Sequence, residues 1–98
     1  MHSIVISDTS CLIILDKINQ LELLYLIYDH VITTPEVALE FNQPIPKWIT
    51  IKSAINKIKQ KELETSIDLG EASALTLALE IKDCILILHD LKARKVAE

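Results

Sequence analysis

Four short apolar runs, rich in β-branched residues, predict the strands of a sheet. One of them alternates Trp48 and Thr50 with Ile49 and Ile51, which is the period-two pattern of a strand. The runs lie at residues 4–6, 31–32, 48–51 and 84–88. Segments with helical spacing separate them.

These intervening segments carry helix signals. Thr9 or Ser10 is expected to cap the first helix, and Pro35 suits the first turn of a later one. Helices are predicted at residues 9–15, 21–28, 33–41, 53–63, 72–81 and 90–98. The second is apolar nearly all round, which predicts a well-buried helix, whereas the fourth has an exposed basic face. Strands that alternate with helices predict an α/β domain with a parallel sheet, whose carboxyl edge carries the function.

Composition narrows the class of protein. The chain has 98 residues and is 50% hydrophobic, and a domain of this size buries about 65% of its extended surface. Cys11 and Cys84 lie in apolar runs and fit no metal or redox spacing, so we expect reduced core residues. The longest apolar run, LLYLIY, is far too short for a membrane span, and no signal peptide is evident. We therefore expect one domain over residues 1–98, in the cytoplasm and without a membrane partner.

Two aspartates occupy equivalent places in the chain. Asp8 follows the first predicted strand and Asp90 follows the fourth, and each precedes a helix. If these strands are neighbours in a parallel sheet, both carboxylates emerge at the same edge. Either residue alone is explained as an N-cap that contributes roughly 1 kcal/mol, whereas the pair points to a shared site.

Three glutamates near helix starts or apolar stripes have structural as well as functional explanations. Glu36 suits the first turn of its helix, and that explanation is sufficient. Glu40 points the way the apolar stripe points, so it either has a partner there or leans into solvent at the border of the stripe. Glu71 heads an apolar stripe beside Gly70, the only glycine, but it also fits a capping box with Asp68.

Carboxylates gathered at one edge of a sheet would repel one another unless a cation binds. The four acids concerned are Asp8, Glu40, Glu71 and Asp90. Oxygen ligands without a His or Cys cluster favour hard ions such as Mg²⁺ or Mn²⁺, which activate water and stabilise a phosphoryl group during displacement. Because a bound metal cancels local charge, the net charge of −4 does not exclude a nucleic acid substrate.

With these motifs, the chain resembles the PIN-domain superfamily of metal-dependent ribonucleases, in a prokaryotic branch close to the VapC-type toxins. The matching stretches are VISDTSCLIIL, TTPEVALEF, DLGEASALTLALE and ILILHDLKARKVA, which are spread along most of the chain, from residue 5 to residue 97. The resemblance implies a three-layer α/β/α domain with a parallel sheet of about four strands. It also implies a Mg²⁺- or Mn²⁺-dependent endoribonuclease that cleaves RNA, acts as the toxin of a toxin–antitoxin pair with a cognate antitoxin, and forms a homodimer.

The resemblance further implies roles for individual residues. The four acids are catalytic and hold the metal, the two aspartates directly and the two glutamates directly or through water. Ser10 resembles the small hydroxyl residue that supports the first acid. His89, Lys92 and Arg94 are candidates for contact with RNA phosphate, although Lys92 also reads as an ordinary solvated helix residue.

The chain departs from the family pattern towards its C-terminal end. In this branch the loop after the fourth strand begins with two acids, whereas here His89 stands first. The site is damaged if the ligand belongs at position 89 and intact if it belongs at Asp90. The family domain also continues with a further strand and helix, so we expect a domain that is incomplete at its C-terminus. The alternative function is therefore a catalytically inactive PIN-like module that binds a protein partner.

Overall fold

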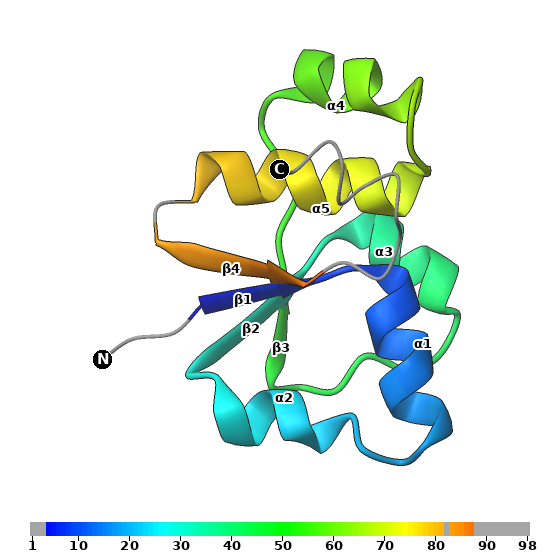
Figure 1. Ribbon diagram of the computed structural model, residues 1–98, viewed down its shortest axis with the longest axis vertical. Helices are drawn as coiled ribbons and strands as arrows, with labels where there is room; N and C mark the ends of the chain where they lie inside the picture. Colours follow the sequence, from blue (N-terminus) through cyan, green and yellow to red (C-terminus); the bar gives the residue numbers. More distant parts are fainter. Residues whose placement is uncertain (1–3, 82, 88–98) are drawn as a thin grey trace.

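The computed structural model describes residues 4–81 and 83–87, and in this part of the chain four strands form one parallel sheet (Figure 1). The strands are β1 (Ile4–Ser7), β2 (His30–Thr33), β3 (Ile49–Ile51) and β4 (Cys84–Ile87). Their order across the sheet is β3-β2-β1-β4, and every pairing is parallel. The predicted parallel sheet is confirmed. β1 and β4 are neighbours in register from Ile4 opposite Cys84 to Ser7 opposite Ile87.

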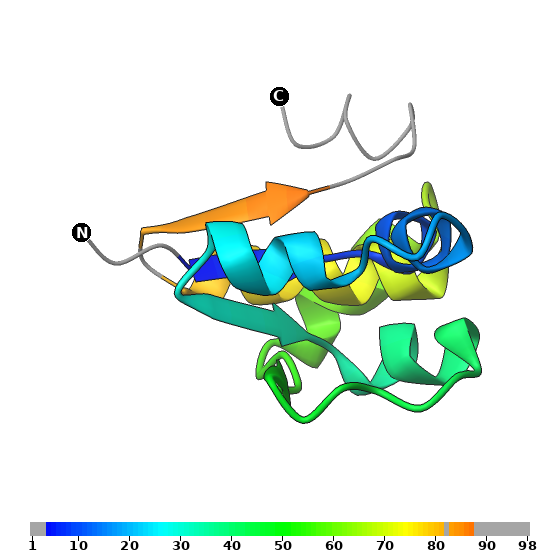
Figure 2. The ribbon, with the colours of Figure 1, turned by 90° about the horizontal axis from the view of Figure 1, so that it is seen from below.

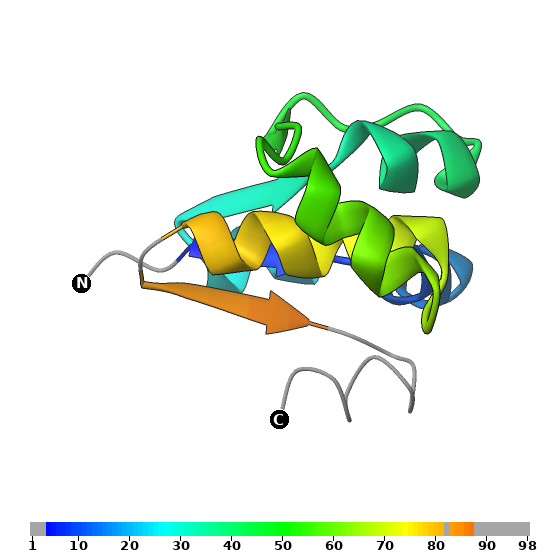
Figure 3. The ribbon, with the colours of Figure 1, turned by 90° about the horizontal axis from the view of Figure 1, so that it is seen from above.

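Helices cover both faces of this sheet. The helices are α1 (Thr9–Lys17), α2 (Glu22–Ile27), α3 (Pro35–Phe41), α4 (Lys57–Glu64) and α5 (Leu69–Glu80). α5 lies on one face with α4 stacked outside it, and α2 lies across the opposite face (Figures 2 and 3). α1 and α3 lie at the carboxyl edge, beyond the arrowheads of β1 and β2 (Figure 1). The fold is the predicted three-layer α/β/α arrangement; the helix predicted at 90–98 lies outside the described residues.

Side-chain caps define where α1 and α4 begin. Asp8, rather than Thr9 or Ser10, is the N-cap of α1, and its Oδ1 accepts a hydrogen bond from the backbone N–H of Cys11 at 2.9 Å. The helix predicted from residue 53 begins only at Lys57, because Asn56 caps it by accepting a hydrogen bond from the backbone N–H of Lys59 at 3.0 Å. In both cases the side chain that satisfies the first free backbone donors sets the start.

The main core lies between the sheet and the helices at its carboxyl half. Val5 and Ile6 of β1 are fully buried, and residues of α1, α3 and α5 pack in the same cluster. The helical members that are fully buried are Leu12, Val37, Ala74 and Leu77. A smaller cluster around Ile67 joins α4 to α5. Since α1, α3 and α5 all dock on one core, their starts and ends are held in fixed relation at one edge of the sheet.

The prediction that residues 21–28 form a well-buried helix is wrong. Of the residues in α2 only Leu24 is buried, whereas Leu26 is 75% exposed and Ile27 is 62% exposed. A helix of six residues that lies across a sheet buries only the side facing the strands, so apolar side chains on its other sides remain in solvent. None of the helices in residues 4–81 is long and apolar enough to cross a membrane.

The two cysteines are free thiols, and both are half-buried. Desolvation by burial is the main reason that the pKa of each thiol is raised above its ordinary value. A raised pKa leaves little thiolate near neutral pH, so neither cysteine is suited to nucleophilic or redox chemistry. The two cysteines were expected to be reduced core residues; the structure shows free thiols, but at half-buried positions rather than among the buried core residues.

Polar contacts tie α4 to α3 at Glu36. Gln60, which is 4% exposed, donates a hydrogen bond from Nε2 to Glu36 Oε2 at 2.6 Å, and Lys57 Nζ lies 3.7 Å from the same oxygen. Desolvation by itself raises the pKa of Glu36, but the hydrogen bonds and the charge of Lys57 together outweigh it and lower the pKa below its ordinary value of 4.5. The ionised form of Glu36 is therefore the one that the fold favours.

This shift makes part of the stability dependent on pH. A carboxyl group whose pKa is lower in the folded chain contributes stability above its unfolded pKa, and that contribution is lost as the pH falls through the folded value. We expect Glu36→Gln to lower the free energy of unfolding near neutral pH, with a difference from wild type that shrinks below pH 4.5. Urea unfolding across this range measures it. Glu62→Gln, which removes a carboxylate from an exposed pair with Lys59, is the control and should change stability little. A difference that is constant with pH would contradict this prediction.

Candidate active site

Asp8 is fully buried where β1 ends and α1 begins. Its backbone N–H donates a hydrogen bond to the carbonyl oxygen of Ile87 at 3.3 Å, so it lies beside the carboxyl end of β4. Its explanation as an N-cap is confirmed, and that role uses the Oδ1 atom. An ionised carboxylate at a fully buried position carries a desolvation cost, which an N-cap does not require since most caps are exposed to water. Burial therefore marks Asp8 as more than a cap.

Glu40 reaches two neighbouring helices from the last turn of α3. Its Oε1 accepts a hydrogen bond from Thr9 Oγ1 at 2.6 Å, and its Oε2 accepts one from the backbone N–H of Gly70 at 3.2 Å. Of the two alternatives left open by the sequence, the structure shows partners for the carboxylate, although the residue keeps a solvent-exposed side. Glu40 is thus held rather than free to lean away.

Glu71 lies in the first turn of α5 and is 5% exposed. Asp68 occupies the N-cap position of the predicted capping box, but its side chain makes no capping hydrogen bond. The positive end of the helix dipole favours a carboxylate in this turn. As with Asp8, however, a helix start does not explain why the carboxylate is buried.

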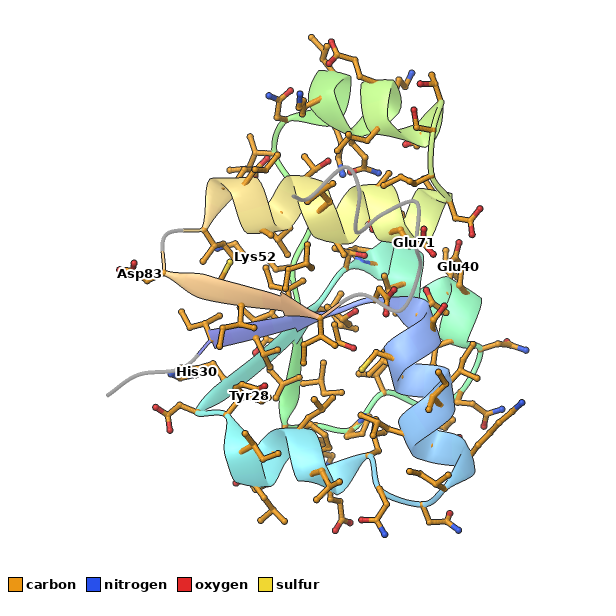
Figure 4. All side chains as sticks on the ribbon, in the orientation of Figure 1. Tyr28, His30, Glu40, Lys52, Glu71 and Asp83 are labelled. Carbon is orange, nitrogen blue, oxygen red and sulfur yellow. The ribbon has the colours of Figure 1, made fainter. Side chains whose placement is uncertain are left out.

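The contacts of Glu40 bring the three acids together. Thr9 directly follows Asp8 in the chain, and Gly70 directly precedes Glu71, so one carboxylate joins the starts of α1 and α5. Figure 4 shows Glu40 and Glu71 side by side at the carboxyl edge, while His30 and Asp83 lie at the opposite edge. The structure therefore places Asp8, Glu40 and Glu71 at the start of α1, the end of α3 and the start of α5, on the same edge of the sheet.

A layer of buried hydroxyl groups lies beneath these acids, and the sequence analysis did not single it out. Thr34 Oγ1 and Ser73 Oγ lie 2.6 Å apart, and Ser73 donates to the carbonyl oxygen of Gly70 at 2.7 Å. Thr33 donates to the carbonyl oxygen of Ser7 at 3.1 Å. These bonds join the ends of β1 and β2 to the start of α5. In the sequence, this layer is indicated by small hydroxyl residues next to strand ends and acids. That pattern is weak evidence, because such residues also favour caps and turns.

The hydroxyl that contacts a site carboxylate is that of Thr9, the neighbour of Ser10, and the acid is Glu40. The support of Asp8 by Ser10 stays a prediction. Asp90 and the candidate RNA contacts lie outside the described residues, and their roles also stay predictions. These candidate RNA contacts are His89, Lys92 and Arg94. The parallel pairing of β1 with β4 does meet the condition under which Asp8 and the segment after β4 share one edge.

The donor chemistry of this edge suits a hard divalent cation. Asp8, Glu40 and Glu71 supply carboxylate oxygens, and no cysteine or histidine side chain takes part in the contacts described above. Within residues 4–81 and 83–87, however, no group of three or more His, Cys, Asp or Glu side chains is placed closely enough to hold a metal ion. The described acids therefore fit such an ion in type, and a complete set of protein ligands would need a further group.

Comparison with known proteins identifies the fold. The model of the PIN-domain family matches residues 4–98, which is nearly the whole chain. The sequence of this chain matches no curated protein and no solved structure. PIN domains are nuclease-like and generally depend on divalent metal ions, in agreement with buried acids at the carboxyl edge of a parallel sheet between helical layers. The chain belongs to the PIN-domain family.

Proposed function

We propose that the protein is a Mg²⁺- or Mn²⁺-dependent endoribonuclease that hydrolyses RNA phosphodiester bonds. One observation carries the proposal: Asp8 is 0% exposed and Glu71 is 5% exposed, and both lie at the edge where Glu40 joins their helices. Burying an ionised carboxylate costs free energy even where hydrogen bonds offset part of that cost, and a nearby positive charge lowers the cost further. Carboxylate oxygens are the ligands that a hard divalent cation prefers, and the nuclease-like character of PIN domains supports phosphodiester hydrolysis as the reaction.

Each acid has a distinct place in this proposal. Asp8 and Asp90 hold the ion directly, and Glu40 and Glu71 hold it directly or through water. An ion held there would make a nucleophilic water available at neutral pH and would neutralise charge on the phosphate. The protein fixes the directions of its acids: the cap bond to Cys11 orients Asp8, and two donors orient Glu40. His89, Lys92 and Arg94 contact the phosphates of the RNA.

The proposed biological role is that of the toxin in a toxin–antitoxin pair in the cytoplasm, with a cognate antitoxin as partner and a homodimer as the assembly. Exposed apolar side chains on α2 support association with another protein. Besides Leu26 and Ile27, Tyr25 is 57% exposed and Leu23 is 39% exposed. Contiguous apolar surface of this kind favours protein contacts over solvent.

A cleavage assay tests the proposed reaction. Purified protein is incubated with a panel of single-stranded and structured RNAs, with Mg²⁺ or Mn²⁺ and with EDTA. We expect cleavage that EDTA abolishes and that excess Mn²⁺ restores, because the buried acids need the ion. Cleavage that persists in EDTA would contradict the proposal. Absence of cleavage, together with no change in thermal unfolding at millimolar Mn²⁺, would favour an inactive interaction module.

A further inference from the structure

The only glycine in the chain occupies a position where its backbone freedom is not used. Gly70 is the second residue of α5, and its φ is not positive. Alanine stabilises helical positions over glycine by up to about 1 kcal/mol, so local preference favours alanine there. A glycine at a helical position therefore has a cause outside the helix.

Glu40 provides that cause. A Cβ atom on Gly70 would overlap Oε1 of Glu40 and would lie 2.9 Å from Glu40 Cδ and 2.8 Å from Thr9 Oγ1. Contacts of this length between carbon and a neighbouring group require something to move. Since Glu40 also accepts hydrogen bonds from Thr9 and from the backbone N–H of Gly70, moving its carboxylate would break contacts on both oxygens.

These contacts define a carboxylate slot, formed by the bare Cα and N–H of Gly70 and by the hydroxyl of Thr9. Each donor binds a different oxygen of Glu40, so together they fix the plane of the carboxylate and not only its position. Glu40 is otherwise a solvent-exposed side chain of a surface helix. Without the slot, its rotamers would be populated freely, and its carboxylate would not stay beside Asp8 and Glu71.

We propose that Gly70 and Thr9 are positioning residues, which hold the carboxylate of Glu40 in its working orientation at the starts of α1 and α5. The catalytic part of this inference rests on the proposed function. The slot itself is a property of the folded chain. It therefore predicts an energetic coupling between Gly70 and Glu40 in the stability of the protein, with or without RNA or metal.

A double-mutant cycle on stability tests the slot. We expect Gly70→Ala to lower the midpoint of thermal unfolding by about 5 °C in the otherwise unchanged chain, because the new methyl group displaces Glu40. In the Glu40→Ala background the same change should raise the midpoint by roughly 2 °C, because the carboxylate is gone, the Thr9 hydroxyl no longer bonds to it and can rotate away from the new methyl group, and helix preference then sets the sign. This reversal of sign supports the slot. An equal decrease in both backgrounds, or an increase in both, would overturn it.

A second set of variants tests positioning in catalysis. Thr9→Val removes the donor at nearly constant volume and should lower kcat for RNA cleavage by about 10- to 100-fold with little change in KM, whereas Thr9→Ser should restore most of the rate. In the Glu40→Gln background, Thr9→Val should cause no further loss. Thr76→Val is the matched control, because Thr76 is also buried and, among the residues that the structure describes, its hydroxyl bonds to the carbonyl oxygen of Ala72 in its own helix and not to a site carboxylate.

The outcomes separate this inference from the proposed function. If the unaltered chain cleaves RNA and Thr9→Val cleaves it equally fast, the positioning role is wrong and the nuclease stands. If Thr9→Val loses as much activity in the Glu40→Gln background as in the unaltered chain, Thr9 does not act through Glu40 and the positioning role is again wrong. If the unaltered chain does not cleave RNA at all, the proposed function fails, and the stability cycle still decides whether the slot exists.

Discussion

Replacing Asp8 by asparagine is expected to abolish RNA cleavage and Mn²⁺ binding while the fold stays intact. Asparagine is as good an N-cap as aspartate, and its side-chain oxygen can still accept the hydrogen bond from the backbone N–H of Cys11. The substitution removes only the negative charge. Since the loss of groups that merely support a metal ligand lowers activity by about 10- to 100-fold, the loss of a ligand's charge should lower kcat/KM by at least about 100-fold.

Thermal unfolding and a matched variant separate the charge from the cap. Mn²⁺ at millimolar concentration should raise the unfolding midpoint of the unaltered chain and should leave that of Asp8→Asn unchanged. Asp68→Asn changes net charge equally at another N-cap, but Asp68 is exposed and makes no capping hydrogen bond, so it should behave like the unaltered chain. A midpoint of Asp8→Asn that still rises with Mn²⁺, or cleavage within about threefold of the unaltered chain, would disprove this role for Asp8.

The start of α1 illustrates what a single sequence can and cannot predict. The run Ser7-Asp8-Thr9-Ser10 contains four residues that can each accept a capping bond, so their side chains alone do not select one. The choice depends on where the strand ends. Asp8 still donates its backbone N–H to Ile87 and keeps an extended conformation (φ −85°, ψ 176°), so the first helical residue is the one after it. A contact between residues far apart in the chain decided a local feature.

The strands could be predicted from the local sequence, whereas the burial of α2 could not. β1 and β4 were predictable as strands because a short β-branched run has few alternatives, and parallel pairing was predictable because strands alternate with helices. That β1 and β4 are neighbours was only a condition in the sequence analysis, which the structure meets. The burial of α2 was not predictable from its apolar residues. Those residues show that the helix avoids water, but they do not show whether this chain supplies enough surface to cover it, and here it covers only the side with Leu24.

Residue types at the site were predictable, but their contacts were not. Asp8, Glu40 and Glu71 stand out because acids beside apolar runs need compensation. The partners of Glu40 come from residues 31 and 30 positions away in the chain, and only the packing of α1, α3 and α5 brings them within hydrogen-bond distance. The single glycine was the usable signal, since a glycine at the start of a helix indicates either a turn or a close approach.

The second large effect is expected in the core that supports the site. Leu12 is fully buried and, with Thr9, is one of two buried residues in α1. Leu12→Ala should lower the free energy of unfolding by about 2–5 kcal/mol, from lost transfer energy and from the cavity left beneath the helix. For a chain of this size, that corresponds to a fall of roughly 10–20 °C in the thermal midpoint. Urea and thermal unfolding measure both quantities.

Ile14→Ala is the control on the same helix, because Ile14 is 39% exposed and should cost much less when truncated. Equal losses of stability for the two variants would show that α1 is not anchored through Leu12.

The comparison of Leu12→Ala with Asp8→Asn separates the structural support of the site from the chemistry at the site. At a temperature where the Leu12→Ala variant is still folded, α1 remains capped by Asp8. The variant should therefore keep its rate of RNA cleavage within a few-fold of that of the unaltered chain. Asp8→Asn should show the opposite combination of full stability and lost cleavage, because the metal needs the charge and the helix needs only the cap.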